Sequence, residues 1–98
     1  MITADSGSVR DNPGRQRFEL PLGELVAFLD YRRRDGALVL SHAEVPHHLE
    51  GQGLGSALVR GALQLVRQAG ERVIPQCPFV VRFMQRHPEF DDLRAAPR

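Results

Sequence analysis

Alternating hydrophobic and polar residues in the first half of the chain predict a series of β-strands. The alternation is clearest over residues 24–33 and 37–45, and a shorter run at 17–20 leads into a Pro-Leu-Gly turn. The segment 34–36 separates the two longer runs, and its Asp-Gly pair is a typical hairpin signal. We therefore expect an antiparallel meander that ends at Pro46.

The third predicted strand has two different faces. Side chains of a strand point alternately to opposite sides of the sheet. Alternation across residues 37–45 gives one set made of Leu38, Leu40, His42 and Glu44, and another made of Val39, Ser41, Ala43 and Val45. The polar pair in the first set takes part in chemistry only if that face lines a cleft.

Helical spacing replaces the alternation in the second half of the chain. Apolar side chains recur every three or four positions over residues 53–69, with arginines and glutamines opposite. Gly70 fits the left-handed residue that ends many helices. A short strand at 72–76 follows, and Pro75 indicates an edge, a bulge or a point where neighbouring strands diverge.

A second helix is predicted to begin after Cys77. Proline suits the first helical position, so Pro78 makes Cys77 the N-cap. Pro88 disfavours helical geometry at His87 and ends the helix there. The order of elements is strand, strand, strand, helix, strand, helix.

These elements define one small domain of the α/β (α+β) class. We expect a mixed, mostly antiparallel sheet with two helices, made of an antiparallel meander followed by one crossover unit. Residues 1–16 show almost no apolar pattern, so we expect a flexible N-terminal lead-in before a single domain at 17–98.

Composition and charge narrow the possible functions. The chain has 98 residues, which is one domain by size. A net charge of +1 argues against nucleic-acid binding through bulk electrostatics. The arginines at 32–34 border a turn and are typical of a solvated surface. One cysteine excludes an internal disulfide, and no Cys or His spacing suits zinc, so we expect no metal.

The sequence gives no sign of a membrane or secretory route. No apolar run approaches the length of a membrane span, and the first residues lack the apolar stretch of a signal peptide. We therefore expect a cytoplasmic protein without a membrane partner.

A glycine-rich segment at 50–55, Glu-Gly-Gln-Gly-Leu-Gly, lies between the third strand and the long helix. Glycines allow a ligand to approach the backbone closely, and the start of a helix offers unpaired N–H groups with partial positive charge. Together they suit phosphates. A nucleoside-triphosphate loop would need a lysine before Ser56, and a dinucleotide fingerprint would need a larger sheet. A plain glycine turn is the remaining alternative.

The loop and its surroundings resemble the GNAT acetyltransferase superfamily, whose cofactor loop reads Gln/Arg-x-x-Gly-x-Gly/Ala. Glu50, Gly53 and Gly55 occupy those places, with Glu50 instead of the usual Gln or Arg. Within that superfamily, the chain more closely resembles one small branch, the YjdJ-type N-acetyltransferase-like domains. The matching stretches are Tyr31-Arg32-Arg33, Ser41 to Pro46, Leu49 to Val59, Val73 to Val80 and Arg86 to Phe90.

The resemblance implies a minimal acyl-CoA N-acyltransferase fold with acetyl-CoA as the acyl donor. It places the pantetheine arm along the third strand, the diphosphate on the amides of the glycine loop, and two phenylalanines at the thioester end. The implied cofactor residues are Ala43, Val45, Glu50, Gly51, Gln52, Gly53, Leu54, Gly55, Ser56, Phe79 and Phe83.

Acetyl transfer to an amine needs a neutral nucleophile, a polarised thioester carbonyl and a stabilised leaving thiolate. Cys77 is the leading catalytic candidate, because the N-terminus of a helix stabilises a thiolate. It would either accept the acetyl group or protonate the departing CoA sulfur; the alternative is a buried apolar side chain. Either His42 or Glu44 would take the proton from the amine. The alternative is that His42 is a hydrogen-bonded core residue and Glu44 a solvated surface charge.

The sequence thus predicts transfer of an acetyl group from acetyl-CoA to an amine of a small molecule or protein. Its rival is a non-catalytic acyl-CoA-binding or sensing module, because so short a domain leaves little surface for an acceptor pocket. The same small size favours a partner protein or a dimer that completes the acceptor site.

Overall fold

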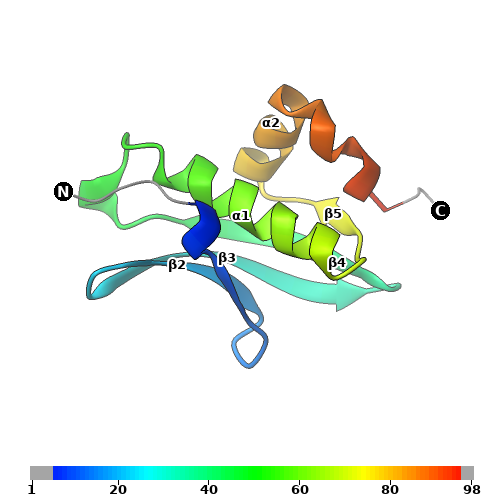
Figure 1. Cartoon of the computed structure of the whole chain (residues 1–98), viewed down its shortest axis with the longest axis horizontal. Coiled ribbons are helices and arrows are strands. Elements are labelled where there is room, and N and C mark those ends of the chain that lie inside the picture. Colours follow the sequence, from blue (N-terminus) through cyan, green and yellow to red (C-terminus); the bar gives the residue numbers. More distant parts are fainter. Residues whose placement is uncertain (1–5, 96–98) are drawn as a thin grey trace.

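The computed structural model describes residues 6–95, which form a sheet with helices on one side (Figure 1). The strands are β1 (Arg10–Asn12), β2 (Arg17–Leu22), β3 (Leu25–Arg34), β4 (Ala37–Glu44) and β5 (Val73–Pro75). The α-helices are α1 (Leu54–Gln68) and α2 (Pro78–Arg86). Short 3₁₀ helices lie at η1 (Ser6–Ser8), η2 (His47–Leu49) and η3 (Pro88–Leu93).

The strands lie in the sheet in chain order, β1-β2-β3-β4-β5. All pairs are antiparallel except β4 and β5, which run parallel because α1 connects them. The β3–β4 hairpin turns at Asp35 and Gly36, both with positive φ, as an Asp-Gly turn requires. The predicted fold class, a mixed and mostly antiparallel sheet with two α-helices, is confirmed.

The core lies between the sheet and the helices. Burial alternates strictly along β2, where Phe18, Leu20 and Leu22 are buried and the residues between them are partly exposed. α1 buries its apolar stripe against this face, including Leu54, Leu58, Ala62 and Val66. Each fully buried leucine contributes about 1.5–3 kcal/mol relative to an exposed one, so this stripe fixes α1, and hence its N-terminus, on the sheet.

The first strand lies in the segment expected to be a flexible lead-in, and the sequence analysis missed it. β1 pairs antiparallel with β2, and η1 precedes it. Val9 is buried in the main core and is the one strongly apolar residue among residues 6–16. The pattern of a three-residue strand at a sheet edge is too short to give a periodic signal. Residues 1–5 lie outside the described part of the chain.

β4 contains a bulge that changes which residues share a face. Asp30 pairs with His42, whereas the next residue of β3 pairs with Leu40, so Ser41 is the extra residue. Leu38 and Leu40 therefore lie in the core on the same side as Ala43 and Val45. The expectation that Leu38 and Leu40 share a face with His42 and Glu44 is wrong, because strict alternation does not hold across a bulge. The mutual pairing of His42 with Glu44 is unaffected.

Candidate functional site

The loop from β4 to α1 runs through two left-handed glycines. After Pro46 and η2, Gly51 and Gly53 have φ values of 83° and 77°. Residues that carry a Cβ atom rarely adopt this left-handed backbone conformation, so both positions favour glycine. Gly53 is the N-cap of α1. The predicted helix start is confirmed to within one residue.

The backbone N–H groups at the glycine-rich end of this loop have no partner among the described residues. The amides of Leu49 and Glu50 bond within η2, and the first bond of α1 runs from the Ala57 amide to the Gly53 carbonyl at 3.1 Å. Between them, within residues 6–95, the amides of Gly51 through Ser56 donate no hydrogen bond. They form a run of donors at the positive end of a helix dipole, which is the arrangement that binds anions.

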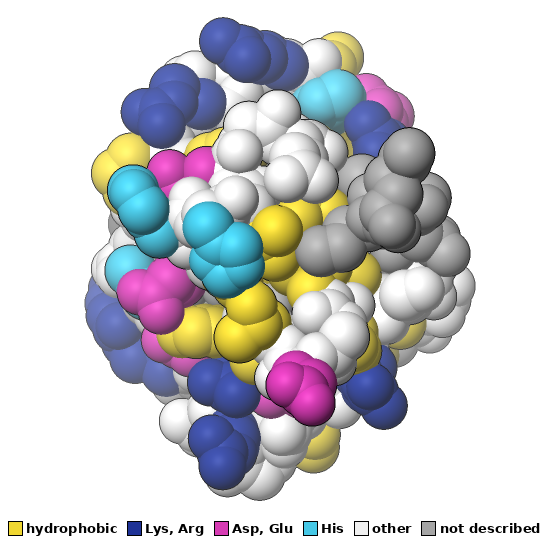
Figure 2. Space-filling view, turned by 90° about the vertical axis from the view of Figure 1, so that its left-hand side faces the viewer, with side chains coloured by type: hydrophobic (Ala, Val, Ile, Leu, Met, Phe, Trp, Pro, Cys, Tyr) yellow, Lys and Arg dark blue, Asp and Glu magenta, His cyan; other side chains and the backbone are white. Residues whose placement is uncertain are grey.

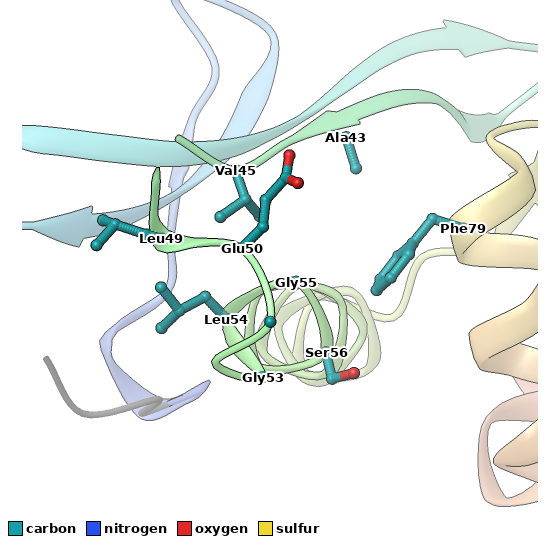
Figure 3. A pocket seen from close by; sticks show the side chains of 10 residues that line it. Ala43, Val45, Leu49, Glu50, Gly53, Leu54, Gly55, Ser56 and Phe79 are labelled. Carbon is teal, nitrogen blue, oxygen red and sulfur yellow. The ribbon is translucent and has the colours of Figure 1, made fainter. Parts of the chain in front are cut away.

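These amides border a cavity of about 470 Å³ between β4, α1 and α2. Figure 3 shows Ala43 pointing down from β4, Phe79 pointing in from α2, and the start of α1 below. The lining residues are Ala43, Val45, Leu49, Glu50, Gly51, Gly53, Leu54, Gly55, Ser56 and Phe79. Figure 2 views the end of the molecule that carries this loop and shows apolar side chains in its centre, with histidines and acidic residues beside them.

Phe79 lies against the first turn of α1. A Cβ placed on Gly55 would lie 2.9 Å from Cζ of Phe79, closer than atoms of this kind approach one another. Gly55 therefore makes room for the aromatic ring. Phe79 is 37% exposed, so its ring forms a wall of the cavity and still meets solvent.

The strands diverge next to the cavity, as Pro75 indicated. β5 pairs with β4 only as far as Leu40, opposite Pro75. The amides of Gln76 and Cys77 both donate to the Leu40 carbonyl at 3.0 Å, and the chain then turns into α2. From Ser41 onward, no described strand pairs with β4 on this side, which leaves an open strand edge beside Ala43.

The structure gathers most of the predicted cofactor residues in one place. Every one lines the cavity except Gln52 and Phe83. Leu49 also lines it, and the sequence analysis missed this residue; its signal was an apolar side chain isolated between Pro46 and the glycines.

Phe83 does not lie in the cavity wall, contrary to the expectation. Its ring is buried and lies 4.1 Å from the His87 ring and 6.2 Å from the Phe90 ring, between centroids. The Arg60 guanidinium covers it at 5.5 Å. Phe83 lies one helical turn beyond Phe79 and packs α2 against α1 and η3, so its role here is in the core.

His42 and Glu44 lie on the opposite side of β4 from the cavity. The bulge directs Ala43 and Val45 toward the helices, so their neighbours point away. His42 Nε2 is 3.6 Å from Glu44 Oε1, and the His42 ring is 6.3 Å from that of Phe28. The two side chains are 58% and 61% exposed, which makes them a solvated pair on the face of the sheet without helices.

Cys77 is the N-cap of α2, as predicted. Its carbonyl accepts the first helix bond, from the Val81 amide at 3.0 Å, while its thiol makes no capping bond. The side chain is buried at 6% exposure and is not one of the cavity-lining residues. Its amide bonds to the Leu40 carbonyl, where the pairing of β4 with β5 ends, and it directly precedes the turn of α2 that carries Phe79.

The arginines at 32 and 33 and the histidine that ends α2 have structural partners. Arg33 makes a two-point ion pair with Glu71 at 3.1 Å, and Arg32 donates to Gln76 at 3.4 Å. His87 ends α2 and stacks on Phe83. In residues 6–95 no three His, Cys, Asp or Glu side chains are grouped to hold a metal ion, and no described helix combines the length and apolar character needed to cross a membrane.

The fold and the glycine loop together define an N-acetyltransferase of the GNAT type. Residues 17–93 match the family model of the GCN5-related N-acetyl-transferases, and this match spans most of the chain. The chain therefore belongs to that family of acetyl-transferring enzymes.

Among solved structures, the chain is similar to a GCN5-like candidate N-acetyltransferase from Staphylococcus aureus, determined in solution. The two share 20% identity with a TM-score of 0.68, over 95% of this chain and 92% of that chain. This likeness shows the fold. No curated protein matches the chain.

Proposed function

We propose that the protein transfers an acetyl group from acetyl-CoA to an amine of a small molecule or protein. The observation that carries the proposal is the run of unpartnered amides from Gly51 to Ser56 on the wall of a largely apolar cavity. Backbone donors at a helix start favour paired phosphates, and the apolar walls favour a flexible thioester arm. Acyl-CoA combines these two groups in one molecule.

The open edge of β4 gives the pantetheine arm a surface to follow. Unpaired strand edges bind extended ligands through backbone hydrogen bonds, and the amides of pantetheine are suited to this pairing. With the diphosphate at the loop, an arm that passes Ala43 leads toward the start of α2. The thioester then lies near Phe79 and Cys77.

Cys77 is the residue that we propose acts on the leaving sulfur. In one route the amine attacks the thioester carbonyl, the carbon–sulfur bond breaks, and the Cys77 thiol gives its proton to the departing CoA sulfur; the proton lost by the amine then restores the thiol. In the other, the Cys77 sulfur attacks first, so that the acetyl group moves onto Cys77 and CoA leaves; the amine then takes the acetyl group and restores the thiol. The N-terminal dipole of α2 stabilises negative charge on sulfur in both routes.

The acceptor amine approaches, in this proposal, from the side of the sheet that has no helices. His42 and Glu44 lie there, on either side of Ala43 along β4. A protonated amine is attracted by the Glu44 carboxylate, and the His42 imidazole accepts its proton. The thioester lies on the helix side, so in this proposal the amine reaches it through the gap that opens between β4 and β5 beyond Leu40.

Substitution of Gly53 by valine tests the loop. Gly53 has positive φ, and a side chain there would meet no protein atom within 4 Å, so it would stand at the cavity wall. We expect calorimetry to show at least a tenfold loss of acetyl-CoA affinity. Gly23→Val is the matched control, because Gly23 also has positive φ and open space but lies in the β2–β3 turn. Equal affinity in both variants would remove the loop from the proposal.

Intact mass after incubation with acetyl-CoA separates the enzyme from a binding module. Acetyl transfer to Cys77 or to an added amine supports the enzyme, whereas tight binding with no transfer to any amine in a panel supports the module. Cys77→Ala should keep acetyl-CoA affinity and lose at least a hundredfold in transfer rate. Full activity in that variant would exclude Cys77 from the mechanism.

A further inference from the structure

Glu50 is the charged residue among those that line the cavity. Figure 3 shows its side chain rising from the loop toward β4, with the carboxylate between Val45 and Ala43. The other lining residues are apolar, glycine or serine. The carboxylate therefore lies in the same cavity as the amides that we assign to the diphosphate, on the side nearer to β4.

Among residues 6–95, no arginine lines the cavity beside this charge. The charged groups that contact the loop from neighbouring elements are few: His47 Nδ1 lies 3.6 Å from Glu50 Oε1, and the His47 side chain is 97% exposed. Glu44 and His42 lie on the other face of β4 and pair with each other. Arg60, further along α1, is engaged by Glu89 and His87. In the described residues, solvent-screened His47 is thus the one ion-pair partner of Glu50.

We propose that Glu50 is a specificity-determining residue that weakens the hold on the phosphate-bearing part of the donor. The inference rests on the proposed function. Like charges repel, and because the Glu50 side chain is 60% exposed this repulsion is screened by water and salt and is strongest at low ionic strength. The backbone amides attract the diphosphate while the Glu50 carboxylate opposes it, so the pantetheine arm contributes a larger share of the recognition.

One consequence is rapid exchange of donor and product. CoA and acetyl-CoA carry the same phosphates, so repulsion by Glu50 weakens both to the same degree. Because affinity changes within one interface act mostly on dissociation, CoA leaves faster after transfer. A second consequence concerns selection, since thioesters with fewer phosphate charges lose less affinity to Glu50 than acyl-CoA does.

Calorimetry with two ligands tests the proposal. CoA carries the phosphates, and pantetheine lacks them but has the same arm. Glu50→Gln keeps the shape of the side chain and removes its charge. We expect this variant to bind CoA about five- to tenfold more tightly than the wild type at low salt, and to bind pantetheine with unchanged affinity. The ratio of the CoA affinity of Glu50→Gln to that of the wild type should fall toward one in 0.5 M salt, because the Debye length falls to a few Å.

Asp35→Asn is the matched control, since it removes one negative charge at the β3–β4 hairpin and asparagine tolerates positive φ. It should leave both affinities unchanged. An unchanged or weaker CoA affinity in Glu50→Gln would overturn the inference, as would an equal gain for pantetheine or for Asp35→Asn. If neither the wild type nor Glu50→Gln binds CoA at any salt, the proposed function itself fails.

Discussion

At the scale of single residues, Tyr31 links parts of the sheet that are distant in the sequence. Its hydroxyl donates a 2.7 Å hydrogen bond to the Asp11 carboxylate, which joins β3 to β1 across β2. Burial, together with this hydrogen bond, raises the pKa of Tyr31 to about 12. Its ring also packs against Phe18, with 5.1 Å between centroids. The missed strand β1 is therefore held by a specific polar contact as well as by backbone pairing.

The Tyr31 hydroxyl makes stability depend on pH in the alkaline range. The folded-state pKa lies above the ordinary value of 10.0, so this stabilisation is complete below pH 10 and is lost as the pH rises toward 12. Tyr31→Phe should cost about 1 kcal/mol at pH 8 for the lost hydrogen bond. The variant should also show a smaller decrease in the free energy of unfolding above pH 10, as measured by urea denaturation.

Tyr31 is the sole tyrosine of the chain, so its ultraviolet titration reports this group directly. A midpoint near 10 in the folded protein would contradict the buried hydrogen bond to Asp11.

At the scale of elements, the sequence predicted the parts that have regular periods. Both α-helices, the hairpin turn at Asp35 and Gly36, and the N-cap at Cys77 lie where the pattern placed them. The bulge at Ser41 was not predictable, because it depends on how β4 pairs with β3 rather than on the alternation within β4. The same bulge decides that Ala43 faces the cavity and His42 does not.

The contact between Gly55 and Phe79 gives a prediction at this scale. Alanine normally favours a helix over glycine by about 1 kcal/mol. At Gly55 its Cβ would lie 2.9 Å from the Phe79 ring, so we expect Gly55→Ala to lower the free energy of unfolding by about 1–2 kcal/mol. In a Phe79→Leu background the same change should be neutral or stabilising. Equal effects in the two backgrounds, measured by chemical denaturation, would show that the residues are not coupled.

The cavity itself was predictable only in part. The glycines predicted an anion-binding loop, because a glycine-rich helix start offers unpaired backbone amides. Phe83 was misplaced because the crossing of α2 over α1 decides which residues of α2 face the cavity, and sequence spacing does not determine that crossing. Leu49 was missed because it lies in a short 3₁₀ turn that has no periodic pattern. The catalytic and cofactor roles of the cavity residues stay predictions.

At the scale of the whole molecule, the segment after α2 packs beside the helices and pairs with the edge strand β5 of the sheet. Figure 1 shows α2 and the segment after it lying on the same side of the sheet as α1. The Ala95 amide donates to the Val73 carbonyl at 2.8 Å, and Arg94 forms a parallel bridge with Val73. β5, which sets the strand divergence beside the cavity, is therefore paired on both sides.

Arg67 of α1 holds η3 in place through several contacts. Its guanidinium donates to the Glu89 carbonyl at 2.8 Å and to Asp92 at 2.6 Å, and it covers the Phe90 ring at 5.2 Å. Arg67→Ala should lower the free energy of unfolding by about 1–2 kcal/mol, through lost hydrogen bonds and lost ring packing. The exposed Arg86 provides the control. Arg86→Ala should change the free energy of unfolding by less than about 0.5 kcal/mol. Similar losses in denaturant titrations of both variants would count against this account.

The central claim is that the amides of Gly51 through Ser56 hold the phosphates of an acyl-CoA. Residue-resolved amide NMR during an acetyl-CoA titration tests it most directly. We predict saturable shifts concentrated at 51–56 and along β4 near Ala43, with the hairpin at Asp35 and Gly36 unmoved. Absence of binding, or shifts confined to the second cavity beside Arg33 and Leu65 at the other end of α1, would contradict the account.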